Sequence, residues 1–266
     1  MRKNGAVPHF ERFIAFGDSI TEGLCDPHPL GGFRGWADRV AEALAFSQGS
    51  IEYFNLAVRG KRLEQVVADQ VPLGMPYVTG AQTLVSFHAG ANNALRPGYD
   101  PSWLFPMYRE SAVRIADTGA QLMLFTVQEV KNPETKTARL WNERFGSFNT
   151  NVREVAHETG ALLLDGNQFD VFFDRRLIAA DRLHLNEDGH RRVAAAVLAN
   201  LGLPHDSDWR DQLPEAQPET VGARVKSNIQ WTTSFLIPWA ARRLTGKSSG
   251  DGRVAKHHEP QLWTAP

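Results

Sequence analysis

A serine, a histidine and an aspartate in this sequence could together perform acyl transfer. Ser19 lies in Gly17-Asp18-Ser19, where a short apolar run gives way to a helical pattern. A serine hydroxyl is a weak nucleophile at neutral pH and needs a base to take its proton. His184 can be that base, because imidazole is the side chain that changes charge near neutral pH. Asp181, three residues earlier, could hold the imidazole in the right tautomer and stabilise the imidazolium.

Acyl transfer also needs hydrogen-bond donors aimed at the negative oxygen of the tetrahedral intermediate. The candidates are the backbone N–H groups of Ser19 and Gly60 and the side-chain amide of Asn92. Gly60 and Asn92 each follow a further apolar run. Ligands of open parallel sheets bind outside the carboxyl ends of the strands. We therefore expect all these groups to meet at one edge of a sheet.

The segments that must position these residues alternate between strand-like and helix-like patterns. Short apolar runs, typical of strands buried on both faces, occupy residues 13–16, 51–58, 83–87, 121–127 and 161–164. Between them, apolar residues recur at helical spacing, as at Leu63, Val66 and Val71. Five strands alternating with helices predict an α/β fold, a three-layer α/β/α sandwich around a five-stranded parallel sheet.

The last helix of this pattern has clear ends. Asn186 is a good N-cap, and Glu187 and Asp188 in the first turn suit the positive end of the helix dipole. Gly202 and Pro204 then end the helix. His184 therefore precedes the final helix of the sheet domain.

These motifs resemble those of the SGNH (GDSL-type) hydrolase family. Gly17-Asp18-Ser19, Gly60, Gly90-Ala91-Asn92 and Asp181-x-x-His184 occur in the order of that family's blocks, and Ser19, Gly60, Asn92 and His184 match the four residues of its name. The resemblance covers residues 10–203. It implies a flavodoxin-like fold, catalytic Ser19, Asp181 and His184, an oxyanion hole of Ser19, Gly60 and Asn92, and an esterase, lipase or thioesterase mechanism without a metal or cofactor.

Three positions depart from the family pattern. Ile20 replaces the usual Leu of the first block, a mild change. Asn55 and Gly60 lie further apart than in the usual second block. Asn93 replaces the aspartate that ends the third block, which affects the geometry of the loop rather than the chemistry.

Other reactive or apolar side chains have more ordinary interpretations. Cys25 has no evident base and is typical of an inert packing residue. His190 could rival His184 as a base but lies inside the last helix, where a partly exposed histidine is expected, and His88 is expected to pack near the site. Side chains that could line an acyl pocket are Phe33, Trp36, Leu95, Trp103 and Phe105, although helical spacing favours the core for Phe33 and Trp36.

Composition excludes several classes of protein. Of the 266 residues, 42% are hydrophobic and 22% charged, which indicates a globular chain with a sizeable core. The single cysteine excludes an internal disulfide framework and a multi-cysteine metal site. A net charge of −1 argues against a nucleic-acid-binding protein. Residues 1–11 are polar and show no leader peptide, so a cytoplasmic location is expected.

The C-terminal part differs in charge from the rest. Residues 1–220 contain 22 Lys and Arg against 28 Asp and Glu, whereas residues 221–266 contain 7 against 2. We predict a hydrolase domain over 1–204, a linker over 205–220 and a basic extension over 221–266, helical at first and then poorly ordered unless it docks. The extension could pack on the domain or a second subunit, or lie on a membrane surface. Its Pro238-Trp239, Arg242-Arg243-Leu244 and Ser248-to-Arg253 run resembles the tail of a bacterial branch of the family.

The sequence therefore favours a serine hydrolase that cleaves a carboxylic ester. An acyltransferase or thioesterase would use the same residues, and a non-catalytic scaffold could keep the same fold. The sequence does not distinguish among natural substrates, nor among oligomeric states.

Overall fold

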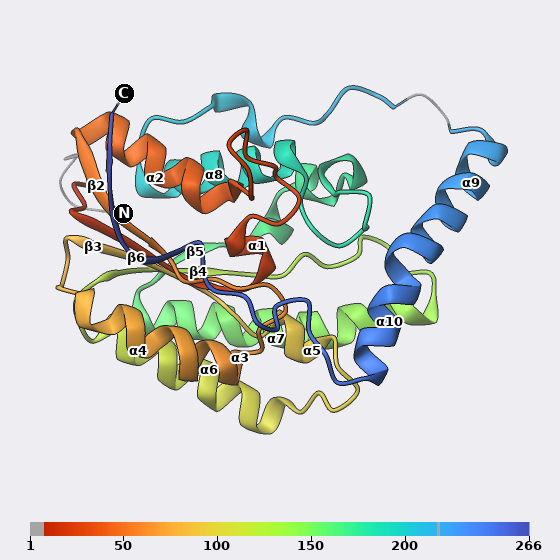
Figure 1. The fold of residues 1–266 in the computed structure, drawn as a ribbon, viewed down its shortest axis with the longest axis horizontal. Coiled ribbons are helices and arrows are strands. Elements are labelled where there is room, and N and C mark those ends of the chain that lie inside the picture. The colour runs from red at the N-terminus through yellow and green to blue at the C-terminus, as the bar shows by residue number, and fades with distance from the viewer. Residues whose placement is uncertain (1–7, 217–218, 266) are drawn as a thin grey trace.

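The computed structural model describes residues 8–216 and 219–265 and is built on one six-stranded sheet (Figure 1). The strands, in sheet order, are β5 (Leu162–Leu164), β4 (Gln121–Phe125), β3 (Thr83–His88), β1 (Arg12–Gly17), β2 (Ser50–Asn55) and β6 (His257–Thr264). The first five are parallel, and β6 pairs antiparallel with β2. The predicted α/β fold is confirmed, but the sheet has one strand more than the five predicted. Residues 1–7, which belong to the polar stretch predicted to contain no leader peptide, lie outside the described residues.

The parallel strands are buried on both faces because helices cover both sides of the sheet (Figure 1). Successive side chains of a strand point to opposite faces. In β1, Phe13 and Ala15 accordingly join one apolar core, and Ile14 and Phe16 join the other. This explains why the strand sequences read as continuous apolar runs rather than alternating ones.

Two helical layers enclose the sheet. One layer contains α2 (Gly35–Gln48) and α8 (Glu187–Leu201); the other contains α3 (Leu63–Gln65), α4 (Val71–Gly74), α6 (Pro101–Ala116) and α7 (Lys136–Thr159). Two one-turn helices, α1 (Ser19–Glu22) and α5 (Ala91–Ala94), follow β1 and β3. The predicted ends of the last helix are confirmed, since Asn186 caps α8 and Gly202 ends it in the left-handed conformation. The longest helix, α7, is not among the segments that the apolar spacing singled out.

The second strand ends three residues earlier than predicted, at Asn55 instead of Val58. The Asn55 side chain accepts a hydrogen bond from the Ala57 N–H (3.2 Å) and donates to the Thr21 carbonyl (2.9 Å). The buried amide therefore turns the chain out of the strand and ties the turn to α1. This turn leads to Gly60.

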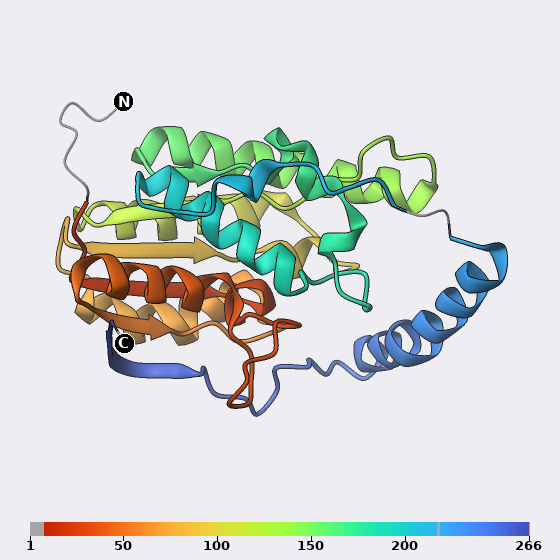
Figure 2. The ribbon, with the colours of Figure 1, turned by 90° about the horizontal axis from the view of Figure 1, so that it is seen from above.

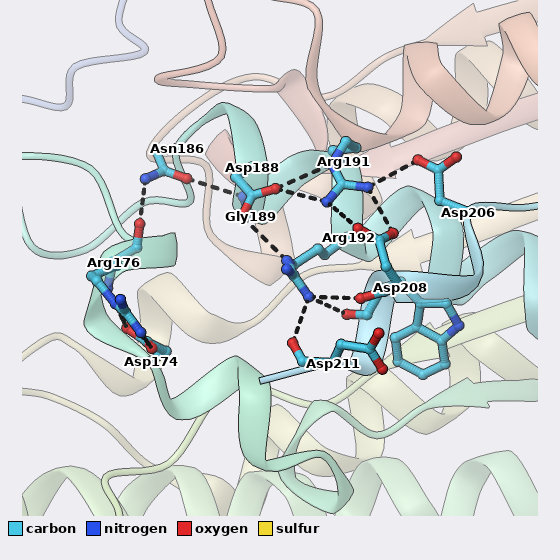
Figure 3. A network of polar contacts seen from close by, with 11 residues as sticks. Asp174, Arg176, Asn186, Asp188, Gly189, Arg191, Arg192, Asp206, Asp208 and Asp211 are labelled. Carbon is cyan, nitrogen blue, oxygen red and sulfur yellow. Dashed lines mark hydrogen bonds and ion pairs between the residues drawn. The ribbon is translucent and has the colours of Figure 1, made fainter. Parts of the chain in front are cut away.

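The region predicted as a linker is partly fixed on α8 (Figure 3). Arg192 donates to the backbone carbonyls of Asp208, Trp209 and Asp211, and Arg191 pairs with Asp206 and Asp208. These contacts hold the short helical turn Ser207–Arg210 against the start of α8. Residues 217–218 of the predicted linker lie outside the described residues.

The C-terminal extension forms a helical arm and then returns to the sheet (Figure 2). The arm consists of α9 (Val221–Trp231), a π-helical turn (Thr232–Leu236) and α10 (Ile237–Leu244). It contacts the sheet domain at the turn of residues 181–182, where the Trp231 indole N–H donates to the Asp181 carbonyl (2.9 Å) and the Arg182 guanidinium lies over the Trp231 ring. Apolar side chains of the arm that remain exposed are Val221, Val225, Ile229, Ile237 and Leu244. Among the described helices, none combines the length and apolar character needed to cross a bilayer. The stretch expected to be poorly ordered unless it docks does dock, because residues 257–264 become β6.

Candidate active site

Ser19, His184 and Asp181 lie in one chain of contacts at the carboxyl end of β1. The Nε2 atom of His184 is 2.9 Å from the Ser19 Oγ, and its Nδ1 atom is 2.5 Å from the Asp181 Oδ2. Ser19 and His184 are 165 residues apart in the sequence, and the fold brings their side chains into contact. The structure thus brings together the three side chains that the sequence analysis selected.

The end of β1 and its glycine position Ser19. A Cβ on Gly17 would overlap the Thr21 side chain and the His88 carbonyl oxygen, so only glycine lets α1 begin this close to β3. Asp18 caps α1 by accepting from the Ile20 N–H (3.3 Å). Ser19 is therefore the first residue of a helix that starts directly above the strand, and the residue as a whole is 8% exposed.

A tight turn holds Asp181 and His184 together. The Oδ1 atom of Asp181 accepts from the backbone N–H groups of Leu183 and His184, both at 3.0 Å. Arg182 adopts a left-handed conformation (φ 60°), and the Ala179 N–H donates to the His184 carbonyl (2.8 Å). The carboxylate thus organises the turn with one oxygen and contacts the imidazole with the other.

The ionisation of Asp181 decides the tautomer of His184. Burial alone would raise the pKa of Asp181, but the hydrogen bond and charge of His184 and the two backbone N–H groups lower it to about 2. An ionised carboxylate can only accept hydrogen bonds, so Nδ1 of His184 carries a hydrogen. The neutral ring then presents the lone pair of Nε2 to the Ser19 hydroxyl, ready to take its proton.

Asn92 connects two of the loops at this edge. Its Nδ2 donates to the Asp18 Oδ2 (3.0 Å) and to the Lys61 carbonyl (3.1 Å). The amide nitrogen is therefore held between the turn that carries Ser19 and the loop that carries Gly60. Gly60 has φ +73°, a conformation that favours glycine, and it does not line the cavity beside Ser19.

The amide of Asn93, at the position where the similar family has a carboxylate, makes two hydrogen bonds that link neighbouring segments. Its Oδ1 accepts from the Leu63 N–H (2.8 Å), and its Nδ2 donates to Glu64 (2.8 Å). Asn93 is 5% exposed, and its side chain links α5 to the start of α3. An asparagine can make both contacts here, whereas an ionised aspartate would face the Glu64 carboxylate without a donor.

A cavity of about 190 Å³ opens beside Ser19, Asn92 and His184. Its walls are largely apolar and include Trp36, Leu95, Phe125, Trp141, Phe145, Leu164, Phe172, Ile178, Leu183 and Val193. Two of the candidates from the sequence, Trp36 and Leu95, line this cavity; Phe33, Trp103 and Phe105 do not. Sequence reasoning missed Trp141 and Phe145, whose i, i+4 spacing on α7 would have placed them on one helix face.

His88 lies in the cavity wall, as the sequence analysis expected. It ends β3, packs against the Phe125 ring (5.5 Å between centroids) and is 9% exposed. Burial lowers its pKa, while the neighbouring Asp18 opposes that shift. His88 is therefore neutral, and its Nδ1 has no hydrogen-bond partner among the described residues.

Cys25 is closer to this centre than the sequence indicated. Its Sγ lies 3.6 Å from the Asp181 Oδ2, the oxygen that also faces His184. Burial, and then the charge of Asp181, raise the pKa of the thiol to about 12, so it stays protonated and can donate to the carboxylate. In the described part of the chain, Cys25, Asp181 and His184 are also the one group whose ligand atoms are close enough to share an ion, but these atoms already contact one another.

His190 is not the partly exposed histidine that the sequence predicted. It is fully buried; its Nδ1 accepts from the Trp36 N–H (3.2 Å) and its Nε2 donates to the Leu24 carbonyl (3.1 Å). Both ring nitrogens are therefore used to join α8 to α2 and to the segment after α1. The prediction of exposure was wrong because α8 packs its His190 face directly on α2.

Comparison with known proteins agrees with this architecture. The sequence profile described as the GDSL-like Lipase/Acylhydrolase family matches residues 15–192. The structure is similar to Axe2, an acetylxylan esterase from Geobacillus stearothermophilus, with a TM-score of 0.59 and 20% identity over 76% of this chain and 99% of that chain. No curated protein matches the sequence.

Two further solved structures have the same fold. The psychrotrophic esterase EstA from Pseudoalteromonas sp. gives a TM-score of 0.54 at 16% identity over 72% of this chain and 97% of that one. LAE5, an alpha/beta hydrolase enzyme from the metagenome of Lake Arreo, Spain, gives 0.54 at 20% identity over 73% and 96%. At these identities the likeness concerns the fold.

Proposed function

The chain belongs to the GDSL-like lipase/acylhydrolase family, and from this premise we propose that it hydrolyses carboxylic esters through an acyl-enzyme formed on Ser19. One observation carries the proposal. The imidazole of His184 lies between the Ser19 hydroxyl, at 2.9 Å, and the Asp181 carboxylate, at 2.5 Å. A nucleophile, its base and the group that orients the base are then aligned.

The proposed reaction has two stages. The Ser19 Oγ attacks the ester carbonyl carbon while Nε2 of His184 takes the hydroxyl proton. The tetrahedral intermediate then collapses, the C–O bond to the alcohol breaks, and Nε2 returns its proton to the leaving oxygen. Water attacks the acyl-enzyme in the same way and releases the carboxylic acid, which restores Ser19. Asp181 stays ionised throughout and stabilises the imidazolium.

The oxyanion would be held by Asn92 and by the backbone N–H groups of Ser19 and Gly60. Asn92 supports this role because the Asp18 and Lys61 contacts fix its amide nitrogen before substrate arrives. An incoming oxyanion would compete with the Lys61 carbonyl for one of the two amide hydrogens. A negatively charged oxygen is a stronger acceptor than this neutral carbonyl, so the hydrogen would shift to the oxyanion.

The cavity favours an apolar acyl group of modest length. Its volume, about 190 Å³, is somewhat larger than a dry, engineered protein cavity of roughly 150 Å³ that accepts benzene. Indole, phenyl and branched aliphatic side chains form most of its wall. We propose that the acyl chain occupies this cavity and that the alcohol faces solvent. The acetylxylan esterase named above shares the fold, and its substrate does not follow for this chain.

Replacement of the nucleophile tests the proposal. Ser19→Ala should reduce turnover of short p-nitrophenyl esters by at least about 10⁴-fold, because the acyl-enzyme cannot form. The melting temperature should change by little, since only one oxygen is removed. A fluorophosphonate probe should label the wild-type protein at Ser19 and should not label the variant.

A matched control is Cys25→Ala, which removes the neighbouring thiol and leaves Ser19 in place. That variant should still be labelled and should still turn over the esters. If Ser19→Ala keeps wild-type rates, the proposed mechanism is wrong. Product analysis with added glycerol or a sugar would detect acyl transfer to an alcohol in place of hydrolysis.

A further inference from the structure

The C-terminal tail packs on the loop that carries Gly60. Residues 248–253, here called the tail turn, meet residues 58–60, here called the 58–60 loop. The Ser248 Oγ occupies the space that a Cβ on Gly60 would need, and the Ser249 Oγ is 3.4 Å from the same point. On the other side of the contact, a Cβ on Gly250 would overlap the Arg59 carbonyl oxygen and lie 3.2 Å from the Val58 side chain.

We propose that the tail turn is a positioning element of the active site, which holds the 58–60 loop so that the Gly60 N–H can bind the oxyanion. This inference rests on the proposed ester hydrolysis, in which Gly60 is an oxyanion donor. Such donors must lie about 2.7–3.1 Å from the developing charge. A displacement of about 1 Å can cost on the order of 10²-fold in rate.

The tail turn is rigid enough for this role. The Ser248 N–H donates to the Asp251 Oδ2 (2.8 Å), and the Gly250 N–H donates to the Ser248 Oγ (3.2 Å). The Arg253 N–H donates to the Gly250 carbonyl (3.1 Å), and its Nε donates to the Ser249 carbonyl (3.0 Å). These bonds are internal to the turn, so the turn presents Ser248 and Gly250 to the 58–60 loop as one unit.

The opposite side of the 58–60 loop is fixed to the nucleophile's own helix. Glu22, at the end of α1, accepts from the Arg59 backbone N–H (2.6 Å) and pairs with the Arg59 guanidinium. That guanidinium also lies over the Phe33 ring, 4.9 Å from its centroid. The loop is therefore held between α1, which carries Ser19, and the tail turn.

The tail turn is itself anchored to the sheet domain. Directly after it, Lys256 reaches inward, and its Nζ contacts the Asp38 carboxylate (2.8 Å) and the carbonyls of Phe33 (3.0 Å) and Arg34 (2.7 Å). The same carboxylate accepts from the Tyr53 hydroxyl (2.8 Å). Beyond Lys256 the chain enters β6 and pairs with β2. A tail fixed in this way can transmit its position to the 58–60 loop.

Substitution of Gly250 tests the inference. In Gly250→Ala, the new methyl group must displace the Arg59 carbonyl, so we expect kcat for a p-nitrophenyl ester to fall by 10- to 100-fold. KM should change by less than about threefold, because the acyl cavity is untouched. Asn92→Ala removes a proposed oxyanion donor completely, so it should lower kcat further, by about 10²- to 10³-fold.

The matched control is Gly222→Ala in the arm of the same tail. A Cβ there meets nothing within 4 Å, and the backbone has no positive φ, so activity should not change. A second variant, Ser248→Ala, removes the Oγ that faces Gly60 and adds no atoms. It can be used to test the inference if Gly250→Ala does not fold. We expect Ser248→Ala to lower kcat by about three- to tenfold.

Inhibitor binding separates positioning from simple loss of structure. A trifluoromethyl ketone reacts with the serine hydroxyl to give a tetrahedral adduct that carries an oxyanion. The affinity of Gly250→Ala and Ser248→Ala for this inhibitor should therefore fall in parallel with kcat, while their melting temperatures stay unchanged. Wild-type kcat in both Gly250→Ala and Ser248→Ala, or an inhibitor affinity that does not follow kcat, would overturn the inference. If instead the wild-type hydrolysis does not depend on Ser19, the proposed function itself fails.

Discussion

Three histidines near α1 show how surroundings decide what an imidazole can do. His190 uses both ring nitrogens for backbone groups and has none left for a substrate. His88 is buried beside the Asp18 carboxylate and stays neutral, but among the described residues its Nδ1 has no hydrogen-bond partner that would orient the ring. His184 alone has a carboxylate on one nitrogen and a hydroxyl on the other. The role of general base therefore follows from the contacts of His184 rather than from its residue type.

Cys25 gives the first prediction at the residue scale. Its thiol faces the same Asp181 oxygen as His184, at 3.6 Å, and helps to hold that carboxylate in place. A thiol is a weak donor, and loss of one such bond is worth about 1 kcal/mol, so Cys25→Ala should lower kcat by roughly fivefold. Steady-state kinetics on a p-nitrophenyl ester would measure this.

Cys25→Ser retains a donor and should recover most of the lost activity. Because the pKa of Cys25 is raised to about 12, the thiol should also react slowly with iodoacetamide at neutral pH. A loss of activity in Cys25→Ala as large as that in Ser19→Ala would contradict a positioning role and would make the cysteine the nucleophile.

At the scale of elements, the sequence predicted the strands well and one major helix not at all. Apolar runs in a sheet covered on both faces are short and continuous, so their positions could be found directly. The ends of the strands were less certain, as β2 shows, because a single buried side chain, Asn55, turns the chain. The helix α7 was missed, and with it Trp141 and Phe145 of the acyl cavity. The catalytic candidates lie on short motifs, whereas the cavity wall is drawn from separate elements that meet only in the fold.

The contribution of α7 to the cavity leads to a prediction about acyl length. Trp141 is half-buried, lines the cavity and donates its indole N–H to the Gln128 carbonyl (3.0 Å). Trp141→Ala should enlarge the cavity and shift the preferred acyl chain upward by two carbons or more. Each added methylene that becomes buried is worth about 0.8 kcal/mol, or roughly fourfold in kcat/KM. Rates on a series of p-nitrophenyl esters would show the shift.

Trp103→Ala is the matched control for this experiment. Trp103 is an indole on α6 that is 40% exposed and does not line the cavity, so its loss should leave the chain-length profile unchanged. An unchanged profile in Trp141→Ala as well would place the acyl chain outside this cavity.

At the scale of the whole molecule, the structure of the C-terminal tail was the feature least predictable from the sequence. Most side chains of β6 are exposed, and the strand contains Pro260, so its own sequence lacks the alternation typical of a half-buried strand. Proline is tolerated on an edge strand, where one side of the backbone has no partner strand. The strand forms because β2 offers an unpaired edge, which β6 covers. We therefore propose that the tail is part of the hydrolase domain rather than an appended segment.

Buried His190 links two parts of the molecule and makes stability depend on pH. Burial is the main cause that lowers its pKa from 6.5 to about 4, and the nearby Asp26, Arg39 and Lys256 modify the shift. At pH values between about 4 and 6.5, the imidazole of His190 is protonated in the unfolded chain and neutral in the folded protein. Stability should therefore fall as the pH drops from about 6.5 to about 4, and the loss from this group should reach about 3 kcal/mol.

A neutral replacement would isolate this contribution. An amide has one acceptor and one donor, so His190→Gln could keep the contacts to the Trp36 N–H and the Leu24 carbonyl without titrating. Its free energy of unfolding, measured by denaturant at pH 7.5 and pH 4.5, should change less with pH than that of the wild type. His157→Gln, which replaces an exposed imidazole on α7, should keep the wild-type pH dependence. If the free energy of unfolding falls equally in His190→Gln and in the wild type between pH 7.5 and pH 4.5, other groups cause the acid sensitivity. In that case protonation of His190 at Nδ1, which would break its bond to the Trp36 N–H, is not the cause.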